Sequence, residues 1–193
     1  EGFTELGWLH FGWEQYYAML NCGLRMRPTA GTANGVHPVP AGFSRVYVDL
    51  GDEKFTPELW QKRLNEGRSF VTTGPMLTIQ ACGIPHEFFV SGAALSAHPI
   101  ERLEIILDGE VFHTVRGDKD QTLRDCFVTK FRIGPDKLNE SAWVAVRCFA
   151  KLPNGRVRFA HSAPVFFDVP GKPLRPRRDQ VRYLIQRCEE EIA

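Results

Sequence analysis

Hydrophobic residues recur at two different spacings along this chain, and the spacing changes near residue 70. Before that point, Trp13, Tyr16, Tyr17 and Leu20 lie three or four positions apart, which is the spacing of one helical face. After it, hydrophobic and polar residues alternate in short runs as far as residue 169. The pattern therefore predicts a helical N-terminal part followed by a β-rich part.

Three helices are expected, and two of them carry clear boundary residues. Gly23 ends the first helix, because glycine readily adopts the left-handed conformation that follows a helix. Thr56 and Pro57 begin the second as an N-cap and a first-turn proline, and Gly67 ends it. The third helix has one apolar face and should dock on another surface. The expected ranges are 8–20, 58–66 and 179–192.

Short strands separated by turn residues fill the region after residue 70. Asp108-Gly109 and Asn154-Gly155 are typical of tight hairpins. Because no helical pattern interrupts these strands, we expect an antiparallel, immunoglobulin-like β-sandwich. The expected strands are 70–73, 76–81, 87–90, 101–107, 110–115, 126–133, 142–149, 156–160 and 163–168. The expected inward-facing residues include Leu103, Ile105, Leu107, Val111, Phe127, Val144, Val146, Cys148 and Val165.

Two further short strands are expected before the sandwich, at 24–26 and 45–50. A helix, a glycine, a short strand and the small-residue loop at 29–38 form the last unit of an α/β repeat. Loops at strand ends are where such domains place their chemistry. We therefore expect a mainly β (α+β) fold in three parts. Residues 1–69 are the tail of an α/β domain, 70–169 the sandwich, and 170–193 a linker with the last helix.

Composition narrows the class of partner. The formal net charge is only +1, so the clustered basic excess of a nucleic-acid-binding surface is missing. No apolar run approaches the roughly 20 residues that cross a bilayer, so no membrane partner is expected. The five cysteines include no CxxC pair, which argues against a zinc ribbon or a disulfide scaffold. We expect a soluble chain, with secreted, periplasmic and cytoplasmic locations all open.

Three stretches in this order carry a family resemblance. The first is YYAMLNCGLR at 16–25 with TAGT at 29–32, and the second is RVYV at 45–48. The third is GRSFVTTGPML at 67–77, with AHSAPV at 160–165 near the end. Together they resemble the C-terminal portion of bacterial metallohydrolases of the CehA/McbA type, relatives of the PHP phosphoesterases. The resemblance implies a metal-binding α/β barrel of the PHP type with an added C-terminal β-domain.

The sequence departs from that family at the loop expected to bind metal. In the family, an aspartate usually follows the alanine-glycine-serine/threonine run and helps to bind the metal, commonly with a histidine close behind. Here Ala33 and then Asn34 follow, and alanine has no lone pair to offer a cation. His37 is the candidate metal ligand, and the alternative is a loop histidine set by the following Pro38. The resemblance places the other ligands, including a His-x-His pair, before residue 1.

Two other groups of residues each allow two interpretations. His161 is either a packed, backbone-bonded histidine or a catalytic base, and no acid or nucleophile lies beside it in sequence. The aromatic face formed by Trp8, Trp13, Tyr16 and Tyr17 is either core and interface or a platform for sugars. Helical spacing favours the core or interface for this face.

Two hypotheses for function follow. The first is the C-terminal region of a PHP-like metal-dependent hydrolase that cleaves ester or phosphoester-type bonds with zinc or manganese. A catalytic zinc needs about three protein ligands, so with His37 alone this chain should bind no metal and catalyse nothing. Its partner would be an upstream barrel domain or a second copy. The alternative is a non-catalytic β-sandwich module for binding or scaffolding, which docks through an exposed Trp8/Trp13 face.

Overall fold

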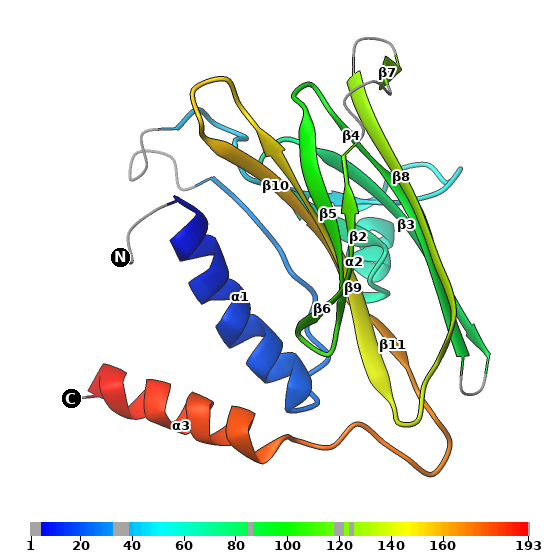
Figure 1. The fold of residues 1–193 in the computed structure, drawn as a ribbon, viewed down its shortest axis with the longest axis vertical. Coiled ribbons are helices and arrows are strands. Elements are labelled where there is room, and N and C mark those ends of the chain that lie inside the picture. The colour runs from blue at the N-terminus through cyan, green and yellow to red at the C-terminus, as the bar shows by residue number, and fades with distance from the viewer. Residues whose placement is uncertain (1–4, 33–38, 85–86, 118–121, 124–125, 193) are drawn as a thin grey trace.

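The structure, a computed structural model, describes residues 5–32, 39–84, 87–117, 122–123 and 126–192. In these residues, antiparallel strands form two sheets, and the helices lie outside them (Figure 1). The helices are α1 (Glu5–Asn21), α2 (Pro57–Asn65) and α3 (Arg178–Ile192). None of the three combines the length and the apolar character that a membrane-spanning helix requires, as far as the described residues go.

The larger sheet has seven strands within the described residues, in the order β1-β2-β10-β9-β5-β6, and β11 pairs with β9 beyond the end of β10. The smaller sheet has the order β3-β4-β8-β7. The strands of the larger sheet are β1 (Arg45–Val48), β2 (Ser69–Thr72), β5 (Ile100–Leu107), β6 (Glu110–Arg116), β9 (Ala142–Lys151), β10 (Val157–Ser162) and β11 (Val165–Phe167). Those of the smaller sheet are β3 (Met76–Ile84), β4 (Glu87–Ser96), β7 (Thr122–Leu123) and β8 (Cys126–Lys137).

The predicted β-sandwich is confirmed, since the main core lies between the two sheets. The larger sheet contributes Leu103, Ile105 and Val146, and the smaller contributes Phe88 and Val90, all fully buried. Strand β1 precedes the expected domain boundary at 69/70, yet it hydrogen-bonds to β2 in the larger sheet. The chain before residue 70 therefore already contributes a strand to the sandwich.

Strand β9 is the centre of the molecule because both of its faces are buried. Val144, Val146 and Cys148 belong to the core between the sheets. Trp143 and Phe149 point to the opposite face and belong to a second core under α1. A strand buried on both faces is expected to be a nearly continuous apolar run, as this one is.

Local sequence signals placed the helix ends and the hairpins correctly. After α1, the Gly23 amide bonds the Leu20 carbonyl and the Leu24 amide bonds the Met19 carbonyl, which is a Schellman motif. Asp108 and Gly109 both have positive φ, at 51° and 93°, in the tight turn between β5 and β6. The strand 45–50 ends earlier than expected, at residue 48.

Two sequence expectations about the strands were wrong. Residues 24–26 form no strand, because Met26 bonds the Leu24 carbonyl and the Tyr16 hydroxyl rather than a neighbouring strand. Val111 is 47% exposed instead of inward-facing. A register shift beside Ile106 pairs it with Val111, so both point to the outer face, and Val111 lies at the sheet edge.

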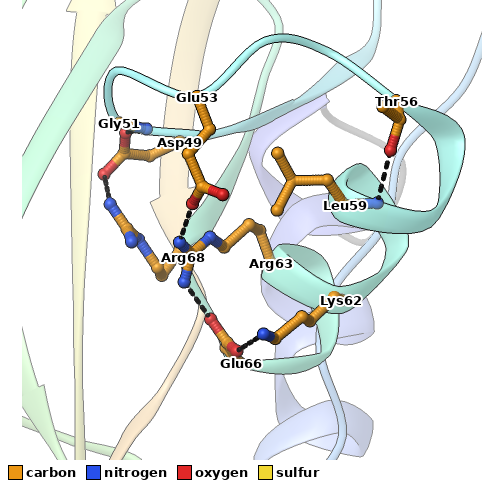
Figure 2. Close-up of polar contacts among 9 residues, drawn as sticks. All are labelled: Asp49, Gly51, Glu53, Thr56, Leu59, Lys62, Arg63, Glu66 and Arg68. Carbon is orange, nitrogen blue, oxygen red and sulfur yellow. Dashed lines mark hydrogen bonds and ion pairs between the residues drawn. The ribbon is translucent and has the colours of Figure 1, made fainter.

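Helix α2 lies on the surface, with no buried residue, and charged residues hold it (Figure 2). The Thr56 hydroxyl accepts a hydrogen bond from the Leu59 amide at 3.1 Å, as the predicted N-cap should. Arg63 bonds Glu66 at 2.8 Å and also pairs with Glu53. Exposed ion pairs of this kind contribute little to stability individually.

Truncating an isoleucine should destabilise the protein more in the sandwich core than at the surface. We expect Ile105→Ala, at a fully buried site, to lower the free energy of unfolding by about 2–5 kcal/mol, because it leaves a cavity between the sheets. Ile185→Ala is the matched control, since Ile185 is 53% exposed on α3. Urea denaturation of both variants measures the difference, and equal losses would contradict this assignment of the core.

Candidate functional site

The candidate site lies where α1 covers the outer face of the larger sheet (Figure 1). Trp13, Tyr17 and Leu20 of α1 pack here against β5 and β9. The Trp13 ring meets Phe149 and Phe159 edge-on, with ring centroids 5.7 and 5.5 Å apart. This second core encloses a cluster of polar side chains. Buried charged groups are unusual in an apolar interface, so we take this cluster as the candidate site. Its members are Tyr17, His161, Arg147, Glu104 and Arg102.

One end of the cluster is a hydrogen bond between α1 and β10. The Tyr17 hydroxyl lies 2.6 Å from His161 Nε2, and His161 Nδ1 lies 2.7 Å from the carbonyl oxygen of Ser162. A carbonyl only accepts, so we assign the hydrogen to Nδ1. Nε2 is then the acceptor for the Tyr17 hydroxyl, and the imidazole is neutral. His161 is 1% exposed.

The other end of the cluster is an ion-pair chain on β5 and β9. Arg147 Nε donates to Glu104 at 2.5 Å, and Arg102 Nε donates to the other oxygen of Glu104 at 2.6 Å. The Arg147 Nη1 lies 3.4 Å from the Tyr17 hydroxyl oxygen, which links the two ends. The Arg147 guanidinium also lies 4.6 Å from the centre of the Trp13 ring, as a cation–π pair.

Burial sets the protonation states in this cluster. It lowers the pKa of His161 to about 4 and raises the pKa of Tyr17 to about 12. Burial also pushes the pKa of Glu104 upward, but the hydrogen bonds from Arg102 and Arg147 outweigh it, so that pKa lies below its usual value. At neutral pH, therefore, the histidine is neutral, the tyrosine protonated and the glutamate ionised.

A second group of polar contacts fixes the C-terminal end of α1. The Asn21 amide accepts from the Trp143 indole N–H at 2.8 Å and donates to the Asp108 carbonyl at 3.0 Å. The Asp108 carboxylate accepts from the Trp143 backbone amide at 2.9 Å and from Arg177 at 3.0 Å. These contacts join α1, the β5–β6 turn, β9 and the segment that leads into α3.

The buried cluster has the residue types of a catalytic site but no access for a substrate. A general base must come within about 2.6–3.2 Å of the proton that it takes, or reach it through one water. His161 and Arg147 are covered by α1, and both imidazole nitrogens already have partners. Burial raises the pKa of the Cys148 thiol to about 12, so it is not a thiolate nucleophile either. The Tyr17, His161 and Arg147 side chains instead attach α1 to the sheet.

A cleft of about 340 Å³ lies between α1, the β5–β6 turn and α3. Its carboxylates are Glu14, Glu110 and Asp179, and Tyr17 forms part of its wall. Nowhere in the described part of the chain do three histidine, cysteine, aspartate or glutamate side chains gather as metal ligands. The described residues therefore do not fit a protein-held catalytic metal.

The predicted metal ligand His37 lies outside the described residues, as do Ala33 and Asn34, and it stays a prediction. The described residues on either side of this segment are joined. The Thr32 hydroxyl accepts a hydrogen bond from the Ser44 amide at 2.9 Å and lies 3.2 Å from the Ser44 carbonyl oxygen.

The interpretation of His161 as a packed, backbone-bonded residue is confirmed. The favoured interpretation of the aromatic helix face as core is confirmed at Trp13 and Tyr17. Trp13 is 8% exposed because its ring packs against the sheet, so the exposed Trp13 of the alternative hypothesis is not found. The Trp8 side chain lies outside the described residues. Glu104 and Arg147 were missed, although charged residues inside the apolar runs 103–107 and 142–150 are a usable signal.

No protein-family model matches this chain, and no curated protein matches it either. The family resemblance seen in the sequence therefore stays a prediction.

Removing Arg147 should test whether the buried cluster is essential to the fold. We expect Arg147→Met to lower the free energy of unfolding by roughly 3–5 kcal/mol, because it leaves Glu104 and the Tyr17 hydroxyl with fewer buried partners. Arg63→Met, in the surface ion pairs of Figure 2, is the matched control and should cost much less. Denaturant titration compares them; similar small losses would show that the buried cluster is dispensable.

Proposed function

We propose that this chain is the C-terminal region of a PHP-like metal-dependent hydrolase and is not catalytic by itself. In this proposal the sandwich holds the helix and loop that the resemblance assigns to the end of the metal-binding barrel. The observation that carries it is that the buried polar cluster attaches α1 to the sheet. The polar atoms of Tyr17, His161, Arg147 and Glu104 are hydrogen-bonded within the cluster, which joins α1 to the sheet.

The course of the chain after α1 supports this positioning role. Arg25 bonds Asp168, which follows β11, at 2.5 Å, and its guanidinium lies 4.8 Å from the centre of the Phe166 ring. The Tyr16 hydroxyl donates to the Met26 carbonyl at 3.1 Å. The segment between α1 and the expected metal-binding loop is thus attached to the sandwich through Arg25 and to α1 through Tyr16.

The metal in the parent family, zinc or manganese, would activate water by lowering its pKa. Holding such an ion takes about three protein ligands, which the described residues do not bring together. In our proposal, an upstream barrel is the partner that supplies the other ligands, and this chain contributes at most His37. The alternative, a non-catalytic β-sandwich module for binding or scaffolding, stays a prediction, and the buried Trp13 would not be part of its docking face.

A hydrolysis assay tests the proposal. We expect the purified chain, with added zinc or manganese, to hydrolyse bis(4-nitrophenyl) phosphate and 4-nitrophenyl acetate no faster than a His37→Ala variant does. The physical reason is that one histidine cannot hold an ion and leave it an open position for water. Release of 4-nitrophenol is the readout, and circular dichroism checks that both proteins are folded. Metal-dependent turnover that His37→Ala removes would overturn the proposal.

A further inference from the structure

We propose that α1 is held on the larger sheet by an acid-sensitive latch, in which protonation of His161 loosens α1 while the sandwich stays folded. The latch is the hydrogen-bonded chain from the Ser162 carbonyl through His161 and Tyr17 to Arg147. It joins α1 to the larger sheet through side chains alone. This inference concerns the docking of α1 and holds whether or not the chain belongs to a hydrolase.

The hydrogen bonds of His161 suit a neutral imidazole. With the hydrogen assigned to Nδ1, which donates to the Ser162 carbonyl, Nε2 accepts from the Tyr17 hydroxyl, 2.6 Å away. Protonation places a second hydrogen on Nε2, pointing at the Tyr17 oxygen. That oxygen already faces the Arg147 Nη1 at 3.4 Å. The hydroxyl hydrogen then loses its acceptor in a buried place, which is costly.

The charges around His161 also oppose protonation. Glu104 pairs with both Arg102 and Arg147, and Arg102 also pairs with Glu101 at 3.4 Å. Arg147 is the cation that acts on His161, and a second cation beside it would be poorly screened in a buried site. The other titratable or charged groups near the cluster include Glu101 on β5, His10, Glu14, Tyr16 and Tyr17 on α1, and Arg27 beside Tyr16. Val71, opposite His161 on β2, does not titrate.

The pKa of His161 agrees with this geometry. Burial, followed by the Arg147 charge, lowers that pKa to about 4, although the bond to the Ser162 carbonyl opposes the shift. The docked state thus binds fewer protons between pH 6.5 and 4 than a state with a solvated histidine. Docking is therefore fully favoured above pH 6.5 and weakens as the pH falls toward 4.

The separation of the two cores explains why α1 should loosen before the sandwich unfolds. The core between the sheets contains residues such as Leu103 and Val146, and none of the α1 side chains that the structure describes. The residues of α1 belong to the other core, with Trp143 and Phe149. Opening that second core leaves the strand ladders and the main core in place. Proteins commonly open locally in contiguous cooperative units of this kind.

Hydrogen exchange measures the latch directly. Between pH 7 and pH 5, we expect the protection factors of α1 amides, corrected for intrinsic exchange, to fall about 20-fold, as a histidine shifted from 6.5 to about 4 requires. Amides of β5 and β9 should keep their protection. His161→Gln, which keeps an acceptor but cannot titrate, should abolish the pH dependence. His113→Gln, at an exposed site on β6, should leave it unchanged.

Several outcomes would overturn the proposal. An unchanged pH dependence in His161→Gln, or its loss in His10→Gln instead, would assign the effect to another group. A parallel loss of protection in β5 and β9 would mean global unfolding. Should His161→Gln fail to fold, an NMR titration of the wild-type imidazole decides the matter. A pKa near 4 supports the latch, and titration near 6.5 with α1 still protected excludes it.

Discussion

The structure depends on the burial of both faces of β9. One face closes the core between the two sheets, and the other would expose Trp143 and Phe149 if α1 were absent. Fully burying a large apolar side chain stabilises a protein by roughly 1.5–3 kcal/mol, so the outer face needs a cover. Helix α1 is that cover. Helix α1 lies where it does because it covers the outer face of β9, and the polar cluster lies between that helix and the sheet.

The polar cluster shows how charged groups can lie inside such an interface. Arg147 lies within an apolar strand, and its charge is matched by Glu104 and shielded by aromatic rings from α1. A buried ion pair often adds little net stability over an apolar substitute, but breaking it is costly. The cluster therefore favours one seating of α1 over others. The ion pairs around α2, which lie at the surface, impose no such choice (Figure 2).

The sequence predicted the parts of the fold that neighbouring residues determine. Gly23, Thr56 and the Asp108-Gly109 turn each act over a few residues, and each was placed correctly. Val111 was misplaced because a bulge shifts the register of β6, and alternation alone does not reveal a bulge. The cluster was missed for another reason: Tyr17 and His161 are 144 residues apart in sequence. Contacts of that kind depend on the topology of the whole sheet.

The turn at Asp108 has a consequence for the order in which the molecule assembles. A two-residue hairpin closes within microseconds, because its strands are adjacent in the chain. Asn21 and Arg177, by contrast, reach the turn from positions 87 and 69 residues away. Closing such long loops is slow, because the entropy lost in closure is offset only when the long-range contact forms. The hairpin is therefore expected to fold first. Helix α1 and the segment before α3 would then dock on the formed turn.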